Sequence, residues 1–137
     1  MRQMNARTTR SAGYLFFMLM AATLLAGCGG VPEPAKTDPK KAVASLQAAL
    51  EKWKSGATIE SLQKEKPVMY ASDEDWQAGL KLAAYELRDV KSQGGYSAHI
   101  PVRLNFDSSN GLLWKEVEYD VTVKDSAVSI SRLDVPE

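Results

Sequence analysis

The sequence predicts an α+β domain in which N-terminal helices pack on a curved, four-stranded antiparallel meander sheet. Two patterns along the chain lead to this class. Between residues 38 and 64, apolar side chains recur every three or four positions, which is typical of amphipathic helices. From about Leu80 onward every second residue is apolar, which is typical of strands with one buried face.

The first helix is predicted over residues Pro39 to Ser55. Asp38 provides an N-cap, Pro39 is favoured in a first helical turn, and Gly56 offers a C-cap. Four apolar residues follow one another at helical spacing between these ends: Val43, Leu46, Leu50 and Trp53.

Two shorter elements are expected before the strands begin. Thr58 can cap a second helix that runs through Lys64 and ends before Pro67. Ser72, with Asp75 three residues later, predicts a capped turn around Trp76.

The strands are predicted near residues 80–92, 96–106, 113–123 and 128–133. In the second strand the apolar positions alternate with polar ones that should face the other side: Ser97, His99, Arg103 and Asn105. Pro101 should place part of this strand at an edge or at a bulge. Turns are expected at residues 93–95, at Asn110-Gly111 and at residues 124–126.

The N-terminal segment has the pattern of a secretory signal. Residues 1–11 are polar and basic, and residues 14–26 (YLFFMLMAATLLA) are almost wholly apolar. This apolar run of about 13 residues is shorter than the ~20 that a membrane span needs. We therefore expect a signal peptide here.

The only cysteine, Cys28, follows this run directly. Leu25-Ala26-Gly27-Cys28 resembles the lipobox of bacterial lipoproteins, in which small residues precede an obligatory cysteine. The resemblance implies cleavage between Gly27 and Cys28, a diacylglycerol on the Cys28 sulfur, and a fatty acid such as palmitate on the new amino group. Two or three acyl chains hold a protein stably on a membrane. Cys28 is thus expected to be a membrane anchor, neither a nucleophile nor half of a disulfide.

These features divide the chain into a signal peptide (1–27), a lipidated N-terminus with a Pro/Gly-rich tether (28–37) and one α+β domain (38–137). The tether has no apolar periodicity and should be extended. Lipoproteins that stay at the inner membrane can carry aspartate directly after the cysteine. This chain has Gly29 there, so sorting to the outer membrane is left open. The resemblance implies a lipid-anchored location in the bacterial cell envelope, with the outer membrane, facing the periplasm, as one site.

The order of elements resembles the cystatin-like and nuclear-transport-factor-like cone folds. The resemblance implies a sheet that wraps around the first helix, with Trp53 anchoring helix to sheet. Isomerases and dehydratases of this type place a tyrosine, an aspartate and often a histidine inside the cone. Tyr85, Tyr96 and Tyr119 lie on predicted strands, but core tyrosines with hydroxyls at the rim are the alternative explanation. The available carboxylates are Asp89, near a strand end, and Asp120, on the opposite face from Tyr119.

Composition excludes some function classes. Removing the three arginines of the signal segment from 17 basic residues leaves 14 against 17 acidic ones, so the mature chain is weakly acidic. Such a balance has no electrostatic footprint for nucleic acid. Phosphate-binding glycine loops, dinucleotide fingerprints and Cys/His metal patterns are absent from the sequence. We expect no nucleic-acid partner, no metal and no cofactor apart from the covalent lipid.

Other polar and aromatic residues have two explanations each. His99, the only histidine, could be a general acid or base, but it has no evident nucleophile as a partner and is expected to be an exposed residue. The acidic run 73–75 suggests helix-start capping more than a calcium loop. Trp76 and Trp114 form either a contact patch for a partner or the end of the core.

The sequence therefore predicts a non-catalytic binding or interaction domain on the membrane, with no catalytic residue assigned. Its partner would be an envelope protein, a peptidoglycan-related molecule or a small molecule, bound through the sheet face or the hairpin ends. One alternative is a cone-pocket small-molecule carrier, or an isomerase or dehydratase, that uses Tyr85, Tyr96 or Asp89. Another is an accessory part of an envelope machine that has no ligand of its own.

Overall fold

The computed structural model describes residues 33–91, 95–107 and 113–133. The predicted signal segment, the lipobox and the start of the tether lie outside these residues, as do the Asn110-Gly111 turn and most of the turn at 93–95. Contacts divide the chain into Met1–Glu33 and Pro34–Glu137, and every element described below belongs to the second unit.

The first helix forms as the sequence predicts, with one small difference at its end. α2 spans Pro39–Lys54, with Pro39 in its first turn. Asp38 is the N-cap, and its side chain accepts a hydrogen bond from the Lys40 amide at 2.9 Å. Ser55 is the C-cap, and Gly56 follows with φ 87°, a left-handed conformation that favours glycine.

Two short helices follow, and both differ from the sequence prediction. α3 spans Ile59–Leu62, shorter than predicted, and Thr58 at its N-cap position makes no side-chain capping bond. α4 spans Glu74–Gln77 around Trp76. Its N-cap is Asp73 and not Ser72, because Ser72 ends a strand and only the next residue is placed to accept from the Trp76 amide.

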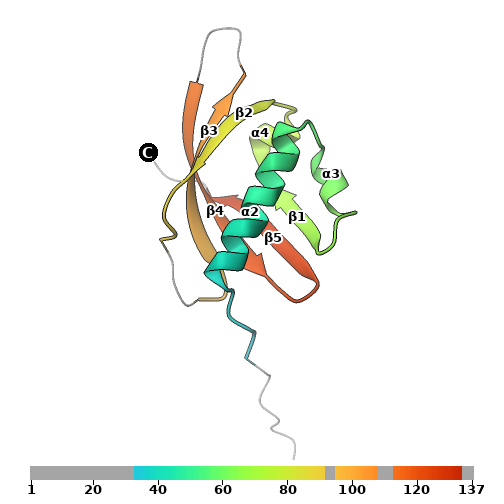
Figure 1. The fold of residues 1–137 in the computed structure, drawn as a ribbon, viewed down its shortest axis with the longest axis vertical. Helices are drawn as coiled ribbons and strands as arrows, with labels where there is room; N and C mark the ends of the chain where they lie inside the picture. Colours follow the sequence, from blue (N-terminus) through green and yellow to red (C-terminus); the bar gives the residue numbers. More distant parts are fainter. Residues whose placement is uncertain (1–32, 92–94, 108–112, 134–137) are drawn as a thin grey trace, which may run out of the picture. The chain divides into compact units, whose positions relative to one another are not determined.

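The sheet contains five strands, so the predicted number was wrong. They are β1 (Val68–Ser72), β2 (Leu82–Leu87), β3 (Ala98–Phe106), β4 (Leu113–Val123) and β5 (Ala127–Leu133). Their order is β1-β5-β4-β3-β2, with antiparallel neighbours except for the parallel pair β1 and β5. The sheet curls, and α2 lies across its concave face (Figure 1). The missed strand, β1, is five residues long, too short to show a period, and its partner is distant in sequence.

Pro101 lies where β3 has no strand paired on its β2 side, so the expected edge position is confirmed, and no bulge forms there. β3 pairs in unbroken register with β4 and lies between β4 and β2. The Pro101 carbonyl accepts from the Arg88 amide at 2.9 Å, so the Pro101 nitrogen faces the same side, just beyond the end of β2. Because proline has no N–H, the reciprocal bond to Arg88 cannot form, and the register of β2 with β3 ends at Leu87 and Val102. The register shift instead falls in β2, between Leu82 and Ala84.

The core lies between α2 and the concave face. The alternating apolar residues are buried as predicted from Ala98 to Phe106 in β3 and from Val117 to Val121 in β4, and they meet the apolar side of α2. Leu113, at the start of β4, was expected in the same alternation but is 63% exposed. Trp53 packs against Phe106 of β3, with ring centroids 5.6 Å apart. Asn105 faces the other side, but it is buried, not exposed, because it pairs with Ala84 and Trp114 on the neighbouring strands.

Candidate functional site

α2 and α4 end with the same pattern of backbone hydrogen bonds. In α2, the amides of Gly56 and Ala57 donate to the carbonyls of Trp53 and Lys52. In α4, the amides of Gly79 and Leu80 donate to the carbonyls of Trp76 and Asp75. Both are Schellman motifs, and both glycines have positive φ, 87° and 81°. The sequences WKSGA and WQAGL are therefore two copies of one helix-ending pattern.

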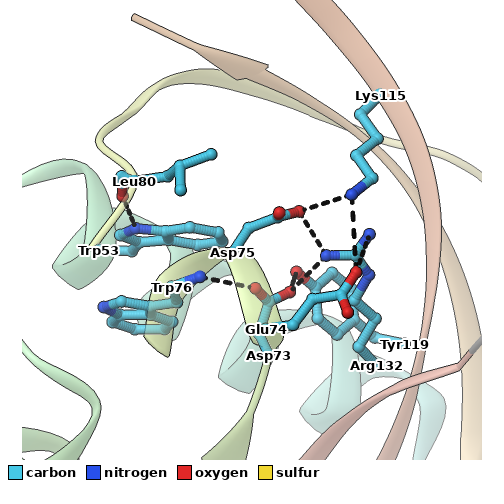
Figure 2. Close-up of polar contacts among 9 residues, drawn as sticks. All are labelled: Trp53, Asp73, Glu74, Asp75, Trp76, Leu80, Lys115, Tyr119 and Arg132. Carbon is cyan, nitrogen blue, oxygen red and sulfur yellow. Dashed lines mark hydrogen bonds and ion pairs between the residues drawn. The ribbon is translucent and has the colours of Figure 1, made fainter. Parts of the chain in front are cut away.

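The two tryptophans of this pattern hold the two helix ends together. Their rings stack in parallel, with centroids 4.9 Å apart and planes at 1° (Figure 2). The indole N–H of Trp53 donates to the Leu80 carbonyl at 2.7 Å, and that of Trp76 donates to the Ala57 carbonyl at 2.8 Å. Each indole N–H thus donates to a backbone carbonyl just beyond the end of the other helix. We call this arrangement the tryptophan clasp.

A cleft opens beside the tryptophan clasp. Its volume is about 290 Å³, and it lies between the segment that leads into α3 and the segment that leaves α4. Trp53 and Trp76 line its inner side, and Leu80 on its border is 40% exposed. Glu60, Gln77, Lys81 and Ile59 complete its edge, so the cleft is apolar inside and polar at its rim. We call it the indole cleft.

A cluster of charged side chains holds α4 on the sheet from the other side. The Asp73 carboxylate, which caps α4, also accepts from the Tyr119 hydroxyl at 2.6 Å. Arg132 of β5 donates to Asp75 at 2.5 Å and lies 3.6 Å from Asp73. Lys115 of β4 donates to the same Asp75 carboxylate at 3.0 Å (Figure 2). Because Asp73, Asp75 and Arg132 have little exposure, each charge depends on its partners.

The cluster shifts the pKa values of its members. Burial would raise the pKa of the Asp75 carboxyl, but hydrogen bonds and charge from Arg132 and Lys115 outweigh burial and lower it. Burial alone would lower the pKa of Arg132, and the carboxylates of Asp75 and Asp73 raise it instead. Burial and the Asp73 charge raise the pKa of Tyr119, so its hydroxyl stays protonated and donates. The pKa shifts of Asp75, Tyr119 and Arg132 all move away from neutral pH, so these three groups keep their protonation states there.

The Asp75 carboxylate predicts an acid-sensitive fold. The pKa of Asp75 is lower in the folded state than its ordinary value of 3.8. Its ion pairs therefore stabilise the fold above pH 3.8, and this contribution is lost as the pH falls through the folded pKa. We expect Asp75→Asn to destabilise the protein at pH 6 and to flatten the loss of stability between about pH 5 and pH 2. Urea unfolding at several pH values measures this. If the free energy of unfolding of Asp75→Asn falls with pH as steeply as that of the wild type, the prediction is wrong.

The tyrosines predicted as pocket residues take part in separate contacts. The Tyr119 hydroxyl is buried on Asp73, not at a rim. The Tyr85 hydroxyl donates to Glu51 of α2 at 2.7 Å, and burial together with this carboxylate raises the pKa of Tyr85 to about 12. Tyr96 is 48% exposed and precedes β3. The structure does not bring the three into one site.

The remaining predicted residues lie in separate places, and His99 and Trp114 are on the outer face of the sheet. His99 faces Glu118 and Asp120, with nitrogen–oxygen distances of 3.5 and 3.3 Å, on the opposite face from Tyr119. Trp114 is half-buried beneath the Arg103 guanidinium, which lies 4.8 Å from the ring centroid. Trp76 is buried in the tryptophan clasp, and Asp89 is exposed after β2. Trp76 and Trp114 therefore do not form one exposed patch.

The space between α2 and the concave face is nearly filled. The cavity there measures about 10 Å³ and is bordered by Leu46, Leu50, Trp76, Tyr119 and Ile130. This is about the smallest cavity volume that can hold a single water molecule.

Fold and cleft together define this unit as a small α+β domain with a curled half-barrel sheet and a surface cleft at paired helix ends. A scan against protein-family models finds no match, and searches of curated proteins and of solved structures find none either. Within residues 33–91, 95–107 and 113–133, no helix is long and apolar enough to cross a membrane. In that same part of the chain, no three His, Cys, Asp or Glu side chains are grouped to hold a metal ion.

Proposed function

We propose that this chain is a lipid-anchored domain of the bacterial cell envelope that binds a partner without catalysis. The anchor is proposed from the sequence Leu25-Ala26-Gly27-Cys28 after a signal-like apolar run. The binding role is proposed from the indole cleft. We also propose the cone-type architecture named from the element order, which the curled sheet around α2 supports.

The two ends of α2 separate the proposed anchor from the proposed binding site. The tether joins the domain at Thr37, immediately before α2, and the indole cleft lies at the other end of this helix. At 1.5 Å per residue, the 16 residues of α2 span about 24 Å. The described residues that precede α2 therefore lie at the end of this helix away from the indole cleft.

The indole cleft is suited to one apolar side chain of a partner protein. Its volume of about 290 Å³ accommodates a single large side chain, and Leu80 adds exposed apolar surface at its edge. Its walls are rigid because both indole N–H groups are hydrogen-bonded to backbone carbonyls. Such preorganised apolar pockets with polar rims are typical of interface hot spots. This rigid cleft is the single observation that carries the binding role.

The alternative from the sequence, a cone-pocket carrier or enzyme, is not favoured by the packing of the core. It requires a cavity between α2 and the sheet, where the structure has about 10 Å³, and ligand pockets usually exceed ~300 Å³. An accessory role without a ligand would need no cleft at all, and the phenotype of a deletion separates it from partner binding.

The proposed anchor predicts the behaviour of Cys28→Ser. Without the sulfur that would carry diacylglycerol, the variant should accumulate as an uncleaved precursor that incorporates no radiolabelled palmitate. Labelling in cells followed by electrophoresis measures this. Lipid labelling equal to that of the wild type would overturn the anchor.

The proposed binding site predicts position-dependent crosslinking. A photoreactive amino acid at Gln77, on the cleft rim, should crosslink to a partner in the intact envelope, whereas the same group at the exposed Glu116 on the outer face should not. Leu80→Glu should abolish the Gln77 crosslink, and the matched surface change Leu113→Glu should leave it intact. Equal crosslinks from both positions, or none from Gln77, would contradict a partner at the indole cleft.

A further inference from the structure

A second, larger groove lies at the start of α2, where the tether joins the domain. Its volume is about 740 Å³, and it is bounded by residues 34–36, the first turns of α2 and the turn between β4 and β5. Its floor is apolar, and three lysines line it. We call it the lysine groove; its main lining residues are Lys36, Lys41, Lys124, Pro67, Val123 and Val128.

The lysines at this end of the domain are unpaired. Lys36, Lys40, Lys41, Lys66 and Lys124 are all exposed, and none makes an ion pair with a residue that the structure describes. Six of the other nine basic residues in the described ranges do make such pairs. Asp38 and Asp125 also line the groove, and the five lysines outnumber their two negative charges. The end that bears the groove is therefore positive within a weakly acidic domain.

The chain itself keeps the lysine groove close to Cys28. Thr37 is fixed to the sheet, because its hydroxyl donates to the Tyr96 carbonyl at 2.5 Å and accepts from the Val123 amide at 3.2 Å. Six residues lead from Cys28 to Pro34, and even fully extended they span only about 20 Å. Wherever a lipid on Cys28 inserts, this positive groove lies within that reach of the membrane surface.

We propose that the lysine groove is a contact surface for the phosphates of anionic phospholipids in the bilayer that holds the anchor. This inference rests on the proposed lipid anchor. Lysines near an anionic membrane surface attract it over about a Debye length, and the short tether keeps the groove within range. The contact would orient α2 so that the indole cleft, at its far end, is directed away from the bilayer.

The test is hydrogen exchange of the lipidated, full mature protein in two kinds of vesicle. One is phosphatidylcholine alone, and the other contains phosphatidylglycerol in addition. We expect the amides of residues 34–45 and 122–128 to exchange at least about fivefold more slowly in the anionic vesicles. Each lysine near an anionic surface strengthens association by about this factor. The triple variant K36Q/K41Q/K124Q should lose this difference. The control variant K54Q/K64Q should keep it, because it removes two exposed lysines that line neither the indole cleft nor the lysine groove and make no ion pair with a described residue.

Each result is decisive. Equal exchange in both vesicles, with Cys28 shown by mass to be acylated in the same sample, would overturn the lysine groove as a membrane contact and leave the anchor standing. A sample without acylation at Cys28 would overturn the anchor and the inference that depends on it. Equal protection by millimolar inorganic phosphate in neutral vesicles would show a free-phosphate site and would overturn the bilayer contact.

Discussion

Trp53→Ala should destabilise the domain by about 4 kcal/mol. This is a large share of the free energy of unfolding of a native protein, which is about 5–15 kcal/mol. The change removes a ring that is 3% exposed, that stacks on Trp76 and that packs on Phe106. It also leaves the Leu80 carbonyl without its hydrogen-bond donor, the indole N–H of Trp53. Urea unfolding of the purified protein, followed by circular dichroism, measures the loss.

Two control variants separate the parts of this effect. Trp53→Phe keeps a ring in the core but removes the donor, so it should cost about 1–3 kcal/mol. Trp114→Ala removes a half-buried tryptophan outside the tryptophan clasp and should cost less than Trp53→Ala. A loss below about 1 kcal/mol for Trp53→Ala would show that the tryptophan clasp does not hold the helix ends together.

Asp73→Ala should destabilise the domain by about 3 kcal/mol or more. This carboxylate caps α4 through the Trp76 amide, accepts from the buried Tyr119 hydroxyl and lies 3.6 Å from Arg132. Its removal costs a helix cap and leaves a buried hydroxyl without an acceptor. Chemical denaturation at pH 7 measures the change.

The partner variant makes this expectation specific. Tyr119→Phe removes the hydroxyl that Asp73→Ala would leave unpaired, so the double variant should be more stable than the sum of the two single losses predicts, by about 1 kcal/mol or more. Losses that add within about 0.5 kcal/mol would contradict a direct bond between Asp73 and Tyr119 in solution.

The parts of the fold that were predictable depend on local signals. Asp38, Pro39 and Gly56 mark the ends of α2 because capping depends on residues within one turn. The alternation in β3 and β4 revealed their buried faces for a similar reason. β1 was missed because a five-residue strand carries almost no periodic signal, and its parallel pairing with β5 depends on the whole fold.

The candidate site was predictable only in part, although the sequence contains signals for it. The repeat of WKSGA and WQAGL shows two similar helix ends, but their mutual stacking is a long-range contact. Arg132 and Lys115 occupy the inward register of β5 and β4, and a cation in an apolar register indicates a buried acidic partner. Which acid of 73–75 caps α4 could not be predicted, because it depends on where β1 ends.

The central claim is that this domain is held on a membrane through Cys28. The most direct measurement is the intact mass of the protein purified from the membranes of the cells that produce it. The account predicts a chain that begins at Cys28 and carries the added mass of a diacylglycerol, with or without a third acyl chain. A chain that keeps residues 1–27, or one that has a free Cys28 thiol, would contradict it.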